Sequence, residues 1–326
     1  MKPRTADANA IDEATLMLRQ GRLVAFPTET VYGLGADARN AGAVAGIFSA
    51  KGRPADHPLI VHLADAAMLS DWAVDIPTSA WQLAKRFWPG PLAIILRKNN
   101  SVPLAVTGGQ DTVALRIPNH PVALQLLQAF GSGIAAPSAN RFCRISPTQA
   151  LHVAEELGDA VAMILDGGPC QVGVESTIVD LSGGRPRLLR PGQLSVAAIE
   201  AVLQQNLLLP EVVESGIRAP GMMAVHYAPV TMALLCPAKD LAKQAQTLLD
   251  DHQRVGVLSH QQDLPGQPLL VMERMPDSAE AYAQALYASL RKLDGLQLDK
   301  ILVEQPPKTE AWRAVNDRLG KATVVV

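Results

Sequence analysis

The amino-acid sequence predicts an α/β protein of two domains. At 326 residues the chain exceeds the usual size of one domain, and each part is long enough to bury its own core. A composition of 48% hydrophobic, 18% charged and 4% aromatic residues is typical of a soluble enzyme rather than of a disordered or coiled-coil protein. After residue 231, strand-like and helix-like segments alternate, which favours a small, doubly wound, Rossmann-like second domain.

The first domain is expected to span residues 1–205. Short apolar runs predict its strands, and apolar residues at helical spacing that stop at glycine or proline predict its helices. The expected strands cover residues 22–26, 58–63, 92–96, 112–117, 134–136, 161–165, 174–179 and 187–189. The expected helices cover residues 10–20, 41–50, 78–88, 120–130, 147–157 and 195–205. The glycine-containing stretch between the first strand and the second helix is expected to be a loop.

Polar residues mark the starts of two of these helices. Asn40 can cap the helix at 41–50. Ser146, Pro147 and Gln149 match a capping box with proline in the first turn, which predicts a helix start at residue 147.

Residues 206–230 have proline and glycine but no helical or strand period, so they predict a long connection between the domains. The second domain is expected over residues 231–326. Its expected strands cover 232–236, 254–258, 268–272 and 300–304, and its expected helices cover 239–250, 278–293 and 310–320.

Charge and cysteine content narrow the class of protein. A formal charge of -2 and a pI near 6.4 argue against a protein that binds nucleic acid through a broad basic surface. These values do not exclude a local basic groove. Cys143, Cys170 and Cys236 form no C-x-x-C pair, so neither a disulfide framework nor a zinc site is indicated. No run approaches the roughly 20 apolar residues of a membrane span. These features favour a cytoplasmic protein without a membrane segment.

A glycine motif suggests a nucleotide site only weakly. Gly33-Leu-Gly35-Ala-Asp-Ala38 matches the loosest dinucleotide fingerprint, but the following residues look like a loop and a helix cap. Glycines needed for turns and close backbone approach are the better interpretation. The sequence contains no G-x-x-x-x-G-K-[ST] phosphate loop.

Lys51 and Arg53 are the most suggestive pair of charges. They could form a surface ion pair with Asp56, or favour the end of the helix at 41–50, where cations interact well with free carbonyl groups. Alternatively, they bind an anion together with Arg116 and the threonine-rich loop before Val31. Single features elsewhere, such as His62 or the turn at 137–140, are equally compatible with structural roles.

Taken together, ten ordered blocks over residues 26–229 resemble the YrdC-domain family, and specifically the long L-threonylcarbamoyladenylate synthases with a linker and a C-terminal domain. The blocks are Phe26-Pro-Thr-Glu-Thr-Val-Tyr-Gly-Leu-Gly35, Lys51-Gly-Arg-Pro54, Pro58-Leu-Ile-Val-His62, Trp88-Pro-Gly-Pro91, Asp111-Thr-Val-Ala-Leu-Arg116, Ala135-Ala-Pro-Ser-Ala-Asn140, Ser146-Pro-Thr148, Gly173-Val-Glu-Ser-Thr177, Leu189-Arg-Pro-Gly192 and His226-Tyr-Ala-Pro229.

The resemblance implies a twisted, mixed sheet with a concave ligand face and a defined reaction. L-Threonine, bicarbonate and ATP give threonylcarbamoyl-AMP and pyrophosphate with Mg²⁺. Downstream threonylcarbamoyl-transfer proteins then use the product to modify an adenosine beside the anticodon of tRNA. Direct contact with tRNA is expected to be weak.

The resemblance also implies roles for particular residues. Lys51 and Arg53 would be catalytic, by neutralising charge at the phosphates, and no protein residue is expected to bind metal. The residues expected to bind ATP are Lys51, Arg53, His57, Thr112, Ser138, Asn140, Ser146, Arg190 and Tyr227. The residues expected to bind threonine are Thr30, His62, Arg116, Ala136 and Ser176. Residues 206–230 would act as a lid over the active site.

Two departures and two alternatives accompany this interpretation. His57 stands where relatives commonly have asparagine, and residues 141–145 are bulkier than usual. A carbamoyl-adenylate-forming module of another pathway, hydrogenase maturation, shares the fold, but its zinc fingers and acylphosphatase domain have no counterpart here. An RNA-binding module is disfavoured by the near-neutral charge.

Overall fold

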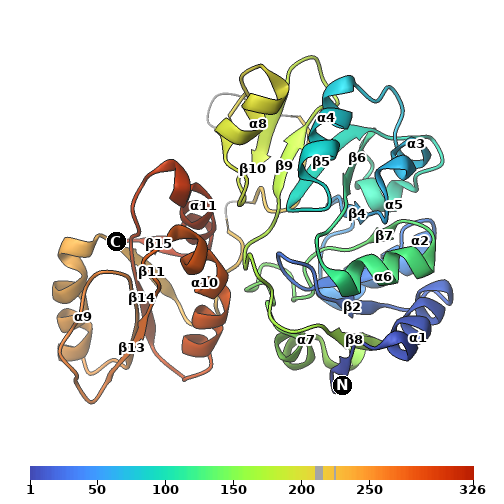
Figure 1. Ribbon diagram of the computed structural model, residues 1–326. Helices are drawn as coiled ribbons and strands as arrows, with labels where there is room; N and C mark the ends of the chain where they lie inside the picture. The colour runs from blue at the N-terminus through green and yellow to red at the C-terminus, as the bar shows by residue number, and fades with distance from the viewer. Residues whose placement is uncertain (210–215, 224) are drawn as a thin grey trace. The chain divides into compact units, whose positions relative to one another are not determined.

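The computed structural model describes residues 1–209, 216–223 and 225–326. The chain divides into two compact units (Figure 1). The first contains Met1–Phe142, Pro147–Gln171 and Glu175–Met222, and the second contains Cys143–Ser146, Val172–Val174 and Met223–Val326. In the connection predicted over residues 206–230, residues 210–215 and 224 lie outside the described part.

The first unit is built on a mixed sheet of ten strands, in the order β1-β8-β2-β3-β7-β4-β6-β5-β9-β10. The strands are β1 Arg4–Thr5, β2 Val24–Phe26, β3 Gly33–Asp37, β4 Ile60–His62, β5 Leu92–Arg97, β6 Thr112–Arg116, β7 Ile134–Ala135, β8 Met163–Asp166, β9 Thr177–Asp180 and β10 Arg187–Arg190. The helices are α1 Ala8–Arg19, α2 Ala41–Lys51, α3 Leu69–Trp72, α4 Thr78–Phe87, α5 Leu104–Thr107, α6 Pro121–Phe130, α7 Ala150–Leu157 and α8 Val196–Leu203, with 3-10 turns η1 Ala66–Met68 and η2 Gly158–Ala160.

Alternating side chains along the strands fill a core on each face of this sheet. Val24 and Phe26 pack with α1 and α6, whereas Ala25 between them joins the cluster that contains residues of α2, α4, α7 and α8. The central register pairs Leu115 of β6 with Val61 of β4 on one side and Ile94 of β5 on the other. The carboxyl ends of β4 and β6 and the start of β9, which pairs with β5, therefore lie at one edge of the sheet although they come from distant parts of the chain.

The second unit contains a parallel sheet of five strands in the order β13-β12-β14-β11-β15. Figure 1 shows α9 on one side of the sheet and α10 and α11 on the other. The strands are β11 Ala233–Cys236, β12 Val255–Ser259, β13 Leu270–Arg274, β14 Lys300–Glu304 and β15 Val324–Val325. The helices are α9 Leu241–Asp250, α10 Ala279–Asp294 and α11 Arg313–Ala322, with 3-10 turns η3 Ala238–Asp240 and η4 Glu310–Trp312.

These two sheets confirm the predicted α/β class, but two local predictions are wrong. Residues 33–37 form strand β3 rather than a loop, and this also excludes the dinucleotide fingerprint, because α2 begins only at Ala41. The capping box at Ser146 does not form. Helix α7 begins at Ala150, after Gln149, which makes no side-chain cap.

No helix in the described part of the chain combines the length and the apolar character that a membrane span requires.

Candidate active site

Lys51 lies at the end of α2, where the chain turns toward another segment of the first unit. Asn40 caps the start of this helix by accepting a hydrogen bond from the amide of Ala43, and Gly52 ends it in the left-handed conformation with φ of 61°. The Lys51 Nζ donates to the carbonyl oxygen of Ser138 at 2.6 Å and also to that of Asn140. Lys51 is therefore held against the turn that carries Ser138 and Asn140, two other residues expected to bind ATP.

Lys51 and Arg53 are both buried, with 3% and 8% of their surface exposed. Arg53 donates from one terminal nitrogen to the carbonyl oxygen of Pro58 at 3.0 Å. This burial argues against the surface ion pair with Asp56 that the sequence also allowed. Two cations held this deeply stabilise an anion more strongly than exposed ones, because water screens them less.

Strand β3 and the residue before it bind the backbone of the turn at residues 137–140, the turn that also accepts hydrogen bonds from Lys51. The amide of Leu34 donates to the carbonyl of Pro137, and the amide of Ala139 donates to that of Tyr32, each at 2.8 Å. Gly35 lets the strand pass close to its neighbours, because a Cβ there would lie 2.8 Å from Phe26 and 2.9 Å from Ile134. The glycine thus allows β3 to lie close to its neighbours in the sheet, and β3 positions the turn that carries Ser138 and Asn140.

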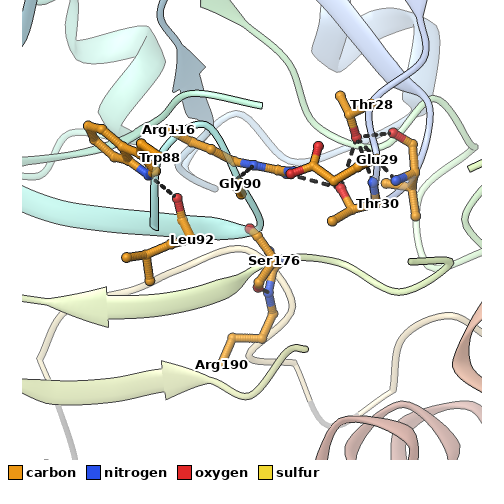
Figure 2. A network of polar contacts seen from close by, with 10 residues as sticks. Thr28, Glu29, Thr30, Trp88, Gly90, Leu92, Arg116, Ser176 and Arg190 are labelled. Carbon is orange, nitrogen blue, oxygen red and sulfur yellow. Dashed lines mark hydrogen bonds and ion pairs between the residues drawn. The ribbon is translucent and has the colours of Figure 1, made fainter. Parts of the chain in front are cut away.

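A second polar centre surrounds Arg116 at the end of β6 (Figure 2). One terminal nitrogen donates to Thr30 Oγ1 at 3.0 Å, the other forms an ion pair with Glu29 Oε1 at 2.7 Å, and Nε donates to the carbonyl of Gly90 at 3.3 Å. The Trp88 indole holds the turn that presents this carbonyl by donating to Leu92 at 2.7 Å. The tryptophan, proline and glycine block therefore orients the arginine.

Thr28 and Thr30 continue this network as a directed chain of hydroxyl groups (Figure 2). Thr28 Oγ1 donates to the carbonyl of Val31 at 2.7 Å and lies 2.9 Å from Thr30 Oγ1. Because the Thr28 proton is used on Val31, the Thr30 hydroxyl must donate to Thr28, and its lone pairs face Arg116. Thr28 thereby fixes the orientation of the Thr30 hydroxyl.

Arg190, at the end of β10, bonds the loop that carries Ser176. Its Nε donates to the Ser176 carbonyl at 2.9 Å, one terminal nitrogen donates to Ser176 Oγ at 3.1 Å, and the other donates to Pro220 at 3.1 Å. The amide of Thr177 in turn donates to the carbonyl of Pro91 at 2.9 Å. This bond joins the Arg190 centre to the turn that holds Arg116.

Two histidines named from the sequence lie beside these arginines. Burial and then the charge of Arg116 lower the pKa of His62 to about 3, so this imidazole is neutral at physiological pH. Burial and the charge of Arg53 also lower the pKa of His57, although Asp56 opposes the shift. His57 packs its edge against Phe142, with ring centroids 5.4 Å apart. Both histidines are therefore suited to neutral contacts rather than to charge neutralisation.

The other residues named from the sequence divide between the two units. Thr112 is the half-buried first residue of β6, and buried Ala136 donates its amide to Ile60 at 3.0 Å. Ser146 and Tyr227 are buried in the second unit. There the Tyr227 ring stacks on Tyr287 of α10 at 5.9 Å and lies 5.3 Å below the Arg318 guanidinium of α11.

Sequence reasoning did not assign a role to Glu29 or Thr28, although both lie in the network of Figure 2. The available signal was a single charged residue between two threonines in an otherwise neutral, buried run from Phe26 to Val31. Such a charge is rarely buried unless it is paired.

We expect Gly192→Ala to disturb the Arg190 centre. A Cβ at this position would lie 2.3 Å from the amide nitrogen of Thr177, so the loop carrying Ser176 must move. Overpacking of this kind costs about 1–3 kcal/mol. We expect turnover to fall by about tenfold or more, as measured by product formation. Gly184→Ala is the control, because no atom lies within 4 Å of its added Cβ, and an equal loss in both variants would contradict the interpretation.

The fold and these residues define a class of protein: an α/β protein whose buried cations are held by carbonyl and hydroxyl oxygens near the ends of its strands. A family model described as telomere recombination (Sua5/YciO/YrdC) matches residues 16–192. A model described as the C-terminal domain of threonylcarbamoyl-AMP synthase matches residues 194–324. The chain belongs to this family, in the long form that carries both domains.

Full-length relatives support this assignment. The chain is 42% identical over 318 residues to the threonylcarbamoyl-AMP synthase of Pyrococcus abyssi, covering 94% of this chain and 92% of that protein. It is 42% identical over 326 residues to that of Bacillus subtilis, covering 96% and 92%. The crystal structure of P. abyssi Sua5 complexed with L-threonine superposes with a TM-score of 0.91 at 40% identity, covering 98% of this chain and 97% of the other.

Proposed function

We propose that the protein is a threonylcarbamoyl-AMP synthase, a nucleotidyltransferase that forms threonylcarbamoyl-AMP and pyrophosphate from L-threonine, bicarbonate and ATP. The observation that carries the proposal is the buried Lys51, held on the Ser138 and Asn140 turn beside Arg53. The similarity to synthases along the whole chain supports it. Neither alternative from the sequence has a comparable observation in its favour.

Charge neutralisation is the main demand of this reaction. An oxygen of the carboxylated threonine attacks the α-phosphorus of ATP, the bond to the β-phosphate oxygen breaks, and pyrophosphate leaves with the electron pair. Lys51 and Arg53 stabilise the negative charge that gathers on the phosphates, because they are fixed in place before the substrate arrives. Ser138 and Asn140 supply neutral donors beside them.

The threonine substrate belongs at the second polar centre. Arg116 provides donors for its carboxylate, and Thr30, His62, Ala136 and Ser176 complete the surroundings of the amino acid in the proposal. The bond between Thr177 and Pro91 keeps the two arginine centres together, which places the reacting groups by positioning rather than by a protein nucleophile.

Mg²⁺ would enter with the triphosphate. The described residues contain no group of three or more histidine, cysteine, aspartate or glutamate side chains that could hold a metal ion. Oxygen ligands from phosphate and water suit Mg²⁺, which commonly binds in this way at nucleotide sites. The ion would neutralise phosphate charge together with Lys51. Downstream transfer proteins would then carry the threonylcarbamoyl group to tRNA.

The connection after α8 is proposed to act as a lid. Within the first unit, Ala219 packs on the apolar face of the sheet, with Ile217 beside it. Arg218 holds this segment in place, because it donates to Gly108 at 2.7 Å and exchanges two bonds with Gln110 through its backbone. A lid of this kind would keep water from a labile product.

We expect Arg218→Ala to release product early. The substitution removes the bond to Gly108 and the ion pair with Asp56 at 3.7 Å, while the backbone bonds to Gln110 remain. One lost bond of about 0.5–1.5 kcal/mol predicts about 2- to 13-fold faster loss of bound product, measured by rapid filtration. Arg97→Ala removes a similarly exposed ion pair, with Asp75, and serves as the control. Unchanged retention would argue against the lid.

The activity itself is tested by pyrophosphate release from ATP, with each substrate omitted in turn and each amino acid supplied in turn. Release is expected only with bicarbonate and L-threonine together. Release that ignores either compound would overturn the proposed function.

A further inference from the structure

Glu29 is a buried carboxylate whose hydrogen-bonding capacity is largely unused. Only 3% of the residue is exposed, and Oε1 forms the ion pair with Arg116. Among the described residues, no hydrogen-bond donor reaches Oε2. An ionised carboxylate can accept about four hydrogen bonds, and buried charges are normally satisfied. Glu29 therefore has unused acceptor capacity beside Arg116.

Other buried carboxylates of the chain are better satisfied. Asp180 Oδ1 accepts from the amide and the hydroxyl of Ser182, at 2.9 and 2.6 Å, and Arg187 lies 3.5 Å from its other oxygen. Glu304 accepts three backbone amide bonds through one oxygen. Asp180 Oδ2, like the oxygens of Glu29, accepts no hydrogen bond within the described residues, but Asp180 and Glu304 each have one oxygen that accepts two or more, whereas neither oxygen of Glu29 accepts any.

Neighbouring titratable groups do not supply the missing donor. His120 faces Glu29, but its Nδ1 accepts from the amide of Val122 at 3.3 Å and the ring also bonds the backbone of Gly167. Burial lowers the pKa of His120, so the ring is neutral. Burial raises the pKa of the Cys170 thiol, which also stays neutral. Arg116 is therefore the partner cation of Glu29 in this centre.

Arg116 has spare capacity of the opposite kind. Its guanidinium carries five N–H donors, and three contacts, to Glu29, Thr30 and Gly90, are present. Unused donors and unused acceptors thus lie side by side on a pair with no net charge. An α-amino acid has the complementary arrangement, with a carboxylate and an ammonium group on one carbon atom.

We propose that Glu29 determines specificity by binding the α-ammonium group of the amino-acid substrate, while Arg116 binds its carboxylate. This inference rests on the proposed function and names what its amino-acid site recognises. A buried arginine alone would attract any anion, including bicarbonate and the phosphates of ATP. Glu29 cancels that attraction and favours a zwitterion instead.

Binding to the full chain without ATP tests the proposal by calorimetry. The ligands are L-threonine and 3-hydroxybutanoate, which lacks the amine but keeps the carboxylate and hydroxyl groups. Wild type is expected to prefer L-threonine by about 10- to 100-fold, as one charge-assisted contact implies. Glu29→Gln is expected to weaken L-threonine and to strengthen the anionic 3-hydroxybutanoate, so that the preference falls below about threefold.

In Glu29→Gln the affinity for L-threonine should fall while the affinity for 3-hydroxybutanoate rises. Structural damage would instead weaken the binding of both ligands. Asp180→Asn, which neutralises another buried acid paired with arginine, should keep the preference. Glu29→Asp keeps the negative charge and should also keep the preference for L-threonine. This variant tests the proposal if Glu29→Gln does not fold. An unchanged preference in Glu29→Gln, or its loss in Glu29→Asp, would overturn the proposal.

The same titrations distinguish this proposal from the proposed function. If another amino acid binds in place of L-threonine, the proposed substrate is wrong, and the role of Glu29 is decided with that amino acid and its amine-free counterpart. If wild type binds L-threonine and 3-hydroxybutanoate equally, the role of Glu29 is wrong while the proposed substrate stands. If no amino acid binds, both are wrong.

Discussion

Replacing Lys51 by alanine is expected to lower kcat/KM for ATP by about 100-fold or more. The substitution removes a fixed positive charge from the phosphates and also the two bonds that hold the Ser138 and Asn140 carbonyls. Hydrogen bonds to charged groups contribute about 1.5–3 kcal/mol each, and each 1.4 kcal/mol in the transition state is about a tenfold change in rate. Pyrophosphate release at varied ATP concentrations measures the effect.

Lys85→Ala is the matched control for this substitution. Lys85 also lies in the last turn of a helix, α4, so both variants lose a similar interaction with the helix dipole, but Lys85 is exposed. We expect Lys85→Ala to retain wild-type activity. Comparable activity in Lys51→Ala and Lys85→Ala would show that Lys51 only stabilises the carboxyl end of its helix, the structural role that the sequence also allowed.

Replacing Arg116 by methionine is expected to lower the free energy of unfolding by about 3–5 kcal/mol. The substitution leaves the buried Glu29 carboxylate without its cation, since both side chains of the pair are only 4% exposed. A charge in this position has no access to water and must be protonated or break the surrounding structure. Urea unfolding, followed at two wavelengths to test for separate transitions of the two units, measures the loss.

A second substitution at Glu29 decides whether the unpaired charge is the cause. Arg116→Met combined with Glu29→Leu should recover most of the lost stability, because an apolar pair of similar volume replaces a buried ion pair. The double variant should still fail to bind L-threonine. If it is as unstable as Arg116→Met alone, lost packing rather than the isolated carboxylate explains the effect.

Local chemistry made much of the fold predictable. Asn40 as a cap, Gly52 after α2 and the apolar spacing of α6 all act within a few residues, so the sequence alone placed those elements closely. The capping box at Ser146 failed, and Gln149 begins α7 without a side-chain cap. Strand β3 was missed because its glycines have low strand preference. Their value lies in the small space beside Phe26 and Ile134, which only the assembled sheet creates.

The sequence by itself determined the α/β class, the order of most elements and the family resemblance, and it marked Lys51, Arg53 and Arg116 as candidates for binding an anion. Only the tertiary structure decided their partners. Lys51 meets Ser138 across 87 residues, and Arg116 meets Thr30 across 86. Glu29 became meaningful only through its pairing with Arg116. Charge and burial depend on neighbours in space, and sheet pairing brings such neighbours together from distant parts of the chain.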